Sequence, residues 1–252
     1  MRLLQAICLI LTSYASLLAL LQPSAGGAQH LATRATLLAL QDWLNVTRRS
    51  LRTFWFLRAF DSSYARFRQA GPLLGAEALL DVVAGSLLGV FGLLETATLP
   101  DMLRIPGLAA FGPDAARRLN EQAQLCWLLA LLVAVLGAGV RVCRLWAERA
   151  VPVAADFGEG EKKKEKGGKD GLVKKREVQE KRRRDKEEAA RKTKAEIAAL
   201  TVKMVNDTLD MVIPANFCGW SNFHSGQVGV AMAATSLITL CGHWERCGRV
   251  VQ

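Results

Sequence analysis

The sequence has little of what a catalytic or metal centre needs. Its three histidines, His30, His224 and His243, are scattered, with no carboxylate or cysteine at metal-ligand spacing. Its six cysteines form no Cys-x-x-Cys pair and lie mostly in or beside apolar runs, which favours a role as small hydrophobic side chains. A glycine-rich phosphate loop, a Gly-x-Ser-x-Gly elbow and a plausible acid pair are also missing. We therefore predict no catalytic residue, no metal and no cofactor, and so no enzyme.

Lysine is missing from the first 160 residues, because every lysine lies between Lys162 and Lys203. The chain has 252 residues, of which 51% are hydrophobic and 22% charged, and its formal net charge is +10. These averages exclude a chain that is disordered throughout, a collagen-like protein and a disulfide scaffold. They describe an apolar, arginine-bearing chain that carries one highly charged insert.

Three apolar segments are candidates to cross a membrane. Residues 122–140 are 19 uncharged residues, close to the roughly 20 needed to cross about 30 Å of hydrocarbon. Residues 79–99 are as long but contain Asp81 and Glu95, so they span only if both acids reach the interfaces or are shielded in a helical hairpin. Residues 226–242 are uncharged and rich in small side chains, which is typical of a packed membrane helix.

A fourth apolar segment, residues 3–21, follows Arg2 and precedes a run of small residues. Taken alone, this pattern is typical of a secretory signal peptide that is cleaved after about Ala28. Two Asn-x-Thr sequons, beginning at Asn45 and Asn206, would accompany such a protein. The alternative is that residues 3–21 form an internal helix of the mature protein.

Small residues recur one helical turn apart in two of these segments. Gly85 and Gly89 lie in the second, and Gly229 and Ala233 lie in the last. Such spacing lets two helix backbones approach closely. We therefore expect these four positions to pack helices together, either within one chain or between copies.

Residues 48–70 have the pattern of an amphipathic helix. Apolar side chains that share an arc of about 100° on this helix are Phe56, Leu57, Phe60, Tyr64 and Phe67. Arginines on the opposite side are Arg48, Arg52, Arg58 and Arg66. This pattern indicates a membrane interface, with the apolar arc inserted and the arginines against headgroups, although a helix packed on its own domain has the same periodicity. The start of the segment fits the arc poorly, so the helix is either best formed from Phe56 onward or covered on two sides at its start.

The insert, residues 161–194, contains 24 charged residues among 34, and 16 of them are basic. Its second half alternates acids and bases without helix breakers, which predicts a solvated helix supported by pairs four residues apart. The alternatives are contact with a membrane surface or an import receptor through residues 174–186. A nucleic-acid partner is not expected, because no interleaved aromatic residues accompany the basic run.

The C-terminal part carries a sequence motif. Residues that match the pattern Leu-Asp-x-x-x-Pro-x-Asn-x-x-Gly are Leu209, Asp210, Pro214, Asn216 and Gly219. Upstream, the same order of features includes the apolar run that begins at Trp127, the charged insert after Trp146 and the segment Arg2-Leu-Leu-Gln5. Together these features resemble the peroxin-11 family of peroxisomal membrane proteins, and they are most similar to its fungal branch.

The resemblance implies an all-α integral protein of the peroxisomal membrane, multi-pass, with two or three membrane helices. Its expected regions are an amphipathic remodelling region (1–72), a membrane hairpin (73–147), the charged insert (148–203) and the family motif with a last membrane helix (204–252). The implied function is peroxisome elongation, proliferation and fission. Amphipathic-helix insertion and self-association would drive it, and the implied partners are anionic lipids, further copies, an import receptor and the division machinery.

Two alternatives remain from the residues themselves. A solute channel would use Asp81 and Glu95 to line a polar path between helices, and a secretory-pathway membrane protein would lose its first segment. The positive-inside rule places the arginine-rich helix and the insert in the cytosol. The number of spans and their orientation stay open at this point.

Overall fold

The computed structural model of the chain describes residues 1–21, 26–71, 75–103, 105–150 and 169–251. Within these residues it contains eight helices and no strand, which confirms the predicted all-α class. Packing divides the chain into two units. The first contains Met1–Gly137 together with Val205–Gln252, and the second contains Ala138–Met204. The four regions expected from the sequence divide the chain by composition and not by packing, and they stay a prediction.

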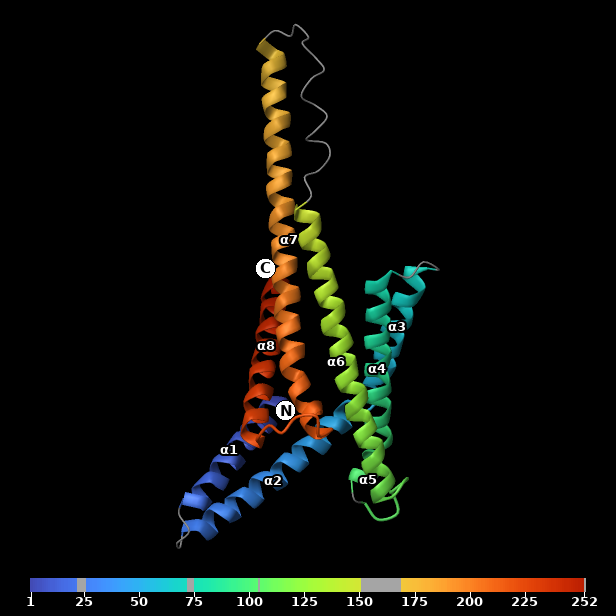
Figure 1. Cartoon of the computed structure of the whole chain (residues 1–252), viewed down its shortest axis with the longest axis vertical. Helices are drawn as coiled ribbons and strands as arrows, with labels where there is room; N and C mark the ends of the chain where they lie inside the picture. The colour runs from blue at the N-terminus through green and yellow to red at the C-terminus, as the bar shows by residue number, and fades with distance from the viewer. Residues whose placement is uncertain (22–25, 72–74, 104, 151–168, 252) are drawn as a thin grey trace. The chain divides into compact units, whose positions relative to one another are not determined.

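Helix α1, Arg2–Leu21, packs against α2, Gly26–Leu51, and against α8, Ser225–Val251 (Figure 1). Gln5 and Ala6 of α1 are buried in this packing. The segment that imitates a signal peptide is therefore a packed helix of the first unit. A secretory protein that lost it would expose the faces of α2 and α8 that α1 covers.

Helices α3, Trp55–Ala70, and α4, Ala76–Ala97, form an antiparallel pair. The short α5, Leu99–Met102, follows, and the next helix, α6, covers Pro113–Ala150. The Phe91 ring of α4 stacks on Trp127 of α6, with ring centroids 5.3 Å apart. The same Phe91 ring meets the edge of Trp55, so aromatic contacts join α3, α4 and α6.

Helix α7, Lys169–Phe217, carries the charged sequence and crosses from the second unit into the first. Its ion pairs four residues apart include Arg184 with Glu180 at 2.8 Å and Lys192 with Glu188 at 2.7 Å. The predicted helix with pairs four residues apart is confirmed in the part that the structure describes, whereas its surroundings stay a prediction. Residues 161–168, the start of the predicted insert, lie outside the described residues.

Among the described residues, four helices are long and apolar enough to cross a membrane, by length and composition. They are α1, α4, the part of α6 up to Glu148, and the part of α8 up to Gly248. In each, at most 28% of the most apolar window is buried, so most of its side chains are at least partly accessible. Such accessible apolar surface requires a partner or lipid to cover it. All four overlap apolar segments identified in the sequence, including residues 3–21, whereas two or three membrane helices were expected.

Candidate functional site

The predicted amphipathic helix over residues 48–70 is interrupted, which corrects the sequence-based boundary. Helix α2 ends at Leu51, residues 52–54 form a turn, and α3 begins at Trp55. The turn is stabilised by side chains, because the Thr53 hydroxyl donates to the Ser50 carbonyl at 2.7 Å. The Thr96 hydroxyl of α4 donates to the Thr53 carbonyl, also at 2.7 Å, and so binds the turn to the end of α4. Helix formation from about residue 56 onward was predicted correctly.

Helix α3 lies against α4 at three glycines. A Cβ atom added at Gly89 would lie 2.6 Å from the Phe60 ring, and one added at Gly92 would lie 2.8 Å from the Trp55 ring. At Gly85 the added Cβ would lie 3.2 Å from the Cβ of Ser63. These distances are too short for most side chains, so the glycines form a notched face that receives α3.

A buried hydroxyl fixes the register of this pair. Ser63 is 4% exposed, and its hydroxyl donates to the Val82 carbonyl at 2.8 Å. It also lies 3.0 Å from the hydroxyl oxygen of Ser86. Gly85 and Gly89 therefore pack two helices of one chain. A contact between two copies at these glycines would require α3 to move away.

The predicted apolar arc of α3 is divided by this packing. Phe56 and Phe60 are half-buried, and both contact the glycine face of α4. Leu57, Tyr64 and Phe67 are 57%, 61% and 54% exposed. One half of the arc is thus occupied within the chain, and the other half is exposed. Membrane insertion of these side chains stays a prediction.

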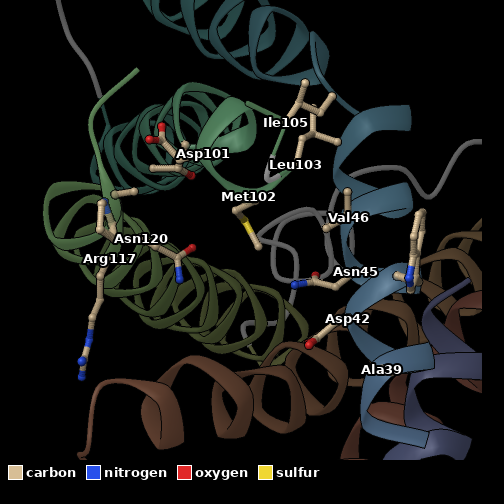
Figure 2. A pocket seen from close by; sticks show the side chains of 14 residues that line it. Ala39, Asp42, Asn45, Val46, Asp101, Met102, Leu103, Ile105, Arg117 and Asn120 are labelled. Carbon is tan, nitrogen blue, oxygen red and sulfur yellow. The ribbon is translucent and has the colours of Figure 1, made fainter. Parts of the chain in front are cut away.

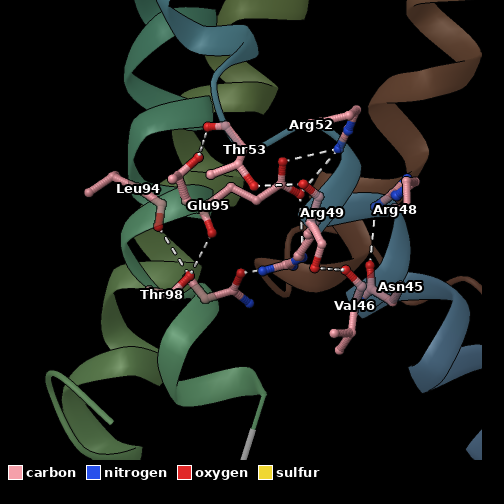
Figure 3. A network of polar contacts seen from close by, with 12 residues as sticks. Asn45, Val46, Arg48, Arg49, Arg52, Thr53, Leu94, Glu95 and Thr98 are labelled. Carbon is pink, nitrogen blue, oxygen red and sulfur yellow. Dashed lines mark hydrogen bonds and ion pairs between the residues drawn. The ribbon is translucent and has the colours of Figure 1, made fainter. Parts of the chain in front are cut away.

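An ion cluster joins α2 and the turn to α4. Glu95 is only 3% exposed, and one of its carboxylate oxygens lies 3.0 Å from the Arg52 guanidinium. The other oxygen lies 3.3 Å from Arg49 Nε, an ion pair without hydrogen-bond geometry (Figure 3). Arg49 is itself 6% exposed and donates to the Asn120 side chain of α6 at 3.1 Å. This cluster neutralises an acid that the sequence places within a candidate span.

Three of the four arginines predicted to contact headgroups have partners within the chain. Arg52 pairs with Glu95, and Arg66 lies 3.8 Å from the Asp81 carboxylate. Arg48 donates to Asn45, and burial lowers its pKa to about 10, with Arg52 adding repulsion. A guanidinium at this pKa stays charged at neutral pH.

Arg58 is exposed on α3, and the Arg66 side chain is 55% exposed despite its ion pair with Asp81. Headgroup contact stays a prediction, for which these two arginines are the more accessible. Asp81 and Glu95 were the candidate lining of a solute channel. Both carry an ion pair to an arginine, and Glu95 is buried, so the described residues offer no support for an open path along them.

The C-terminal motif builds a helix end and a tie to α1. Asp210 is buried and forms an ion pair with Arg2. Pro214 is fully buried, and the Asn216 side chain accepts a hydrogen bond from the Phe223 amide at 3.0 Å. Leu209, the remaining half-buried member, precedes Asp210 on α7.

Gly219 ends α7. Its φ of 75° lies in the left-handed region that favours glycine. The Gly219 amide donates to the Asn216 carbonyl, and the Trp220 amide donates to the Ala215 carbonyl at 2.9 Å, the two bonds of a Schellman motif. The motif thus turns the chain from α7 towards α8.

The small residues of α8 face α1. A Cβ atom added at Gly229 would lie 2.9 Å from Ile10 and 3.1 Å from the Ala6 carbonyl oxygen. Ala233, one turn further, is half-buried. Gly229 therefore allows close contact between two candidate membrane helices of the same chain.

Figure 2 shows the residues that line a cavity of about 790 Å³. Its lining comes from α2, from α5 with the residues around it, and from the start of α6, and includes Trp43, Val46, Met102 and Asn120. Met102 and Asn120 also accept hydrogen bonds from Arg49. Sequence reasoning missed this cavity and the role of Arg49, because no local pattern links α2 to α6.

The described residues contain no group of three or more His, Cys, Asp or Glu side chains that could hold a metal ion. All six cysteines lie among the described residues and are free. Burial, followed by the negative charge of Glu121, raises the pKa of the Cys218 thiol, so this thiol stays protonated at neutral pH. The features that the site offers are the exposed apolar side chains and the arginines of α3.

Comparison with known protein families identifies the family of the chain. The model of a protein family described as Peroxisomal biogenesis factor 11 (PEX11) matches residues 7–244. No curated protein and no solved structure matches the chain. The family match includes α3, the glycine face of α4 and the C-terminal motif.

Proposed function

Because the chain belongs to the PEX11 family of peroxisomal biogenesis factors, we propose that it elongates the peroxisomal membrane by inserting α3 into the cytosolic leaflet. Apolar side chains wedged beneath the headgroups expand one leaflet relative to the other, and this asymmetry curves the bilayer. Elongation then prepares the organelle for fission. The proposal uses no catalytic residue, metal or cofactor.

The observation that supports the proposal most is the open half of the apolar arc on α3. Three apolar side chains of α3 are more than half exposed, namely Leu57, Tyr64 and Phe67. Arg58, which follows Leu57 on the same helix, is exposed as well. Large apolar side chains beside exposed arginine are typical of helices that lie in the interface of an anionic membrane.

Apolar burial outweighs charge at this face. Moving Leu57 or Phe67 from water into the acyl region contributes roughly 1.5 to 3 kcal/mol each. An arginine near an anionic surface contributes about 1 kcal/mol, and salt screens this attraction. We therefore expect apolar contacts to dominate binding, with Arg58 adding a smaller, salt-dependent attraction.

The proposal includes four kinds of partner. Anionic lipids of the peroxisomal membrane would receive α3, and further copies of the chain would concentrate the wedges. An import receptor would contact the basic run at residues 174–186, and division machinery would act on the elongated membrane afterwards. The two glycines Gly85 and Gly89 face α3, so self-association of the closed chain needs another surface.

The test uses the full chain reconstituted in anionic liposomes, with tubulation scored by electron microscopy. Leu57→Asp places a carboxylate on the open half of the arc, where it touches none of the α4 glycines, and it should abolish tubulation. Ser62→Asp is the matched control, because Ser62 is exposed on the opposite side of α3. If the two variants tubulate liposomes equally well, a wedge formed by this arc is excluded.

A further inference from the structure

Half of the apolar arc has two competing uses. Phe56 and Phe60 pack into the glycine face of α4, where Gly89 and Gly92 leave no room for a side chain of their own. The same two phenylalanines belong to the arc that would insert beneath the headgroups. A side chain cannot occupy a helix notch and a lipid leaflet at once, so full insertion of α3 requires the α3–α4 pair to open.

The charges of α3 and of the turn before it have the same two uses. Arg52 pairs with Glu95, and Arg66 lies beside Asp81. Both acids are on α4, near its two ends. Helix α4 therefore offers α3 what an anionic membrane offers, which is an apolar surface between negative charges.

We infer that α4 is an internal clasp that holds α3 in a closed state, and that anionic lipid competes with α4 for α3. The inference rests on the proposed function, because it concerns the regulation of the same amphipathic helix. A ligand shifts such an equilibrium only through its different affinity for the two states. Here anionic lipid binds the open state more tightly than the closed state, because only the open state also presents Phe56, Phe60 and Arg52, so more anionic lipid opens more chains.

The ion cluster allows opening without stranding a buried charge. When α3 leaves, Arg52 moves with it, since Arg52 lies in the turn that leads into α3. Arg49 stays on α2, 3.3 Å from the Glu95 carboxylate, and keeps that acid paired. Glu95 can release the half-exposed Arg52 at modest cost because the buried Arg49 stays paired with it. If Arg52 were its single partner, opening would leave the Glu95 carboxylate buried and unpaired.

Both ends of α3 are suited to movement. The turn at residues 52–54 precedes the helix, and Gly71, with φ of 67°, ends it. A Cβ atom added at Gly71 or Gly75 would meet no atom within 4 Å, so the backbone there is not enclosed. Rotation at these two points would change the position of α3, and at the turn it would break the hydrogen bond from the Thr96 hydroxyl of α4 to the Thr53 carbonyl.

A reversible crosslink tests the clasp. The hydroxyl oxygens of Ser63 and Ser86 are 3.0 Å apart, so cysteines at these two positions can form a disulfide across the closed pair. The parent is the full chain with its six free cysteines replaced. Ser63→Cys with Ser86→Cys in this parent should tubulate anionic liposomes when reduced and lose that activity when oxidised.

The rate of disulfide formation gives a second readout that does not depend on tubulation. Under a mild oxidant, the double-cysteine variant should form its disulfide several-fold more slowly in vesicles that contain anionic phospholipid than in neutral vesicles. Equal rates would overturn the competition between lipid and α4. Tubulation by the oxidised protein equal to that by the reduced protein would overturn the clasp while leaving the proposed function intact.

Failure of the wild-type chain to tubulate liposomes would instead refute the proposed function, and the clasp with it.

A second variant tests opening of the α3–α4 pair in the other direction. Gly89→Leu fills the notch that holds Phe60 and should increase tubulation, whereas Gly242→Leu adds the same side chain to α8 at a position with no atom within 4 Å. If Gly89→Leu tubulates no more than Gly242→Leu, packing at the notch does not restrain α3.

Discussion

Replacement of Glu95 by glutamine should destabilise the protein more than the same replacement of its more exposed partner, Arg52. Glutamine keeps the volume of the side chain but removes its charge. Arg49 is 6% exposed, and Glu95 is the one carboxylate paired with it among the described residues, so the change would remove that partner. The hydrogen bonds of Arg49 to the Asn120 side chain and the Met102 sulfur would remain. A buried cation without its counter-charge costs more than the pair contributes.

The expected magnitude follows from burial. Removing one partner of a buried ion pair costs about 3 to 5 kcal/mol, and the neutral contacts of Arg49 place Glu95→Gln at the lower end of this range. The side chain of Arg52 is 39% exposed, so it can turn to water after the change. Arg52→Gln should accordingly cost about 1 kcal/mol or less, as expected for a half-exposed pair.

The measurement is thermal unfolding in a mild detergent, followed by circular dichroism. For a chain of this size the midpoint shifts by roughly 2 to 4 °C per kcal/mol. The double variant Glu95→Leu with Arg49→Met removes both buried charges, and it should be more stable than Glu95→Gln alone. An effect of Glu95→Gln no larger than that of Arg52→Gln, or a double variant less stable than the single one, would refute the reasoning.

Two further predictions concern the C-terminal motif. Asp210→Asn should lower stability by about 1.5 to 3 kcal/mol, because it removes the charged hydrogen bond to Arg2. The same unfolding measurement checks this, with Asp185→Asn at an exposed position of α7 as the control, and equal effects of the two changes would contradict a role for the pair. Gly219→Ala should cost about 1 kcal/mol, because alanine is strained at a φ of 75°, whereas Gly242→Ala, in a helix interior, should stabilise by up to about 1 kcal/mol. Shifts of the same sign would exclude this backbone explanation.

The parts of the fold that the sequence predicted are those encoded locally. A continuous uncharged run at residues 122–140 indicated a long helix, and α6 contains it. Alternating charges at residues 174–194 indicated a helix with pairs four residues apart, and α7 has them. In both cases neighbouring residues determine the structure, so no knowledge of distant contacts was needed.

The parts that the sequence did not predict depend on contacts between distant segments. Glu95 and Arg52 are 43 positions apart, and no periodic pattern links them. The apolar arc of α3 was visible in the sequence, but the half that faces α4 depends on where Gly89 and Gly92 lie in space. Periodicity gives the direction of a face relative to its helix, whereas the identity of its partner requires the three-dimensional arrangement.

The charges of α3 and α4 also determine where the closed pair can lie. Arg58 and Asp61 are exposed on α3, and each would cost about 2.5 to 3.5 kcal/mol at the centre of a bilayer. The outer side of α3 in the closed pair must therefore face water or headgroups, so lipid can surround α4 only after α3 has moved. Asp81 lies within the first two turns of α4, where its side chain can reach the interface, and Glu95 retains Arg49. Helix α4 thus tolerates both states, and movement of α3 into the leaflet is the step that would let α4 enter the hydrocarbon.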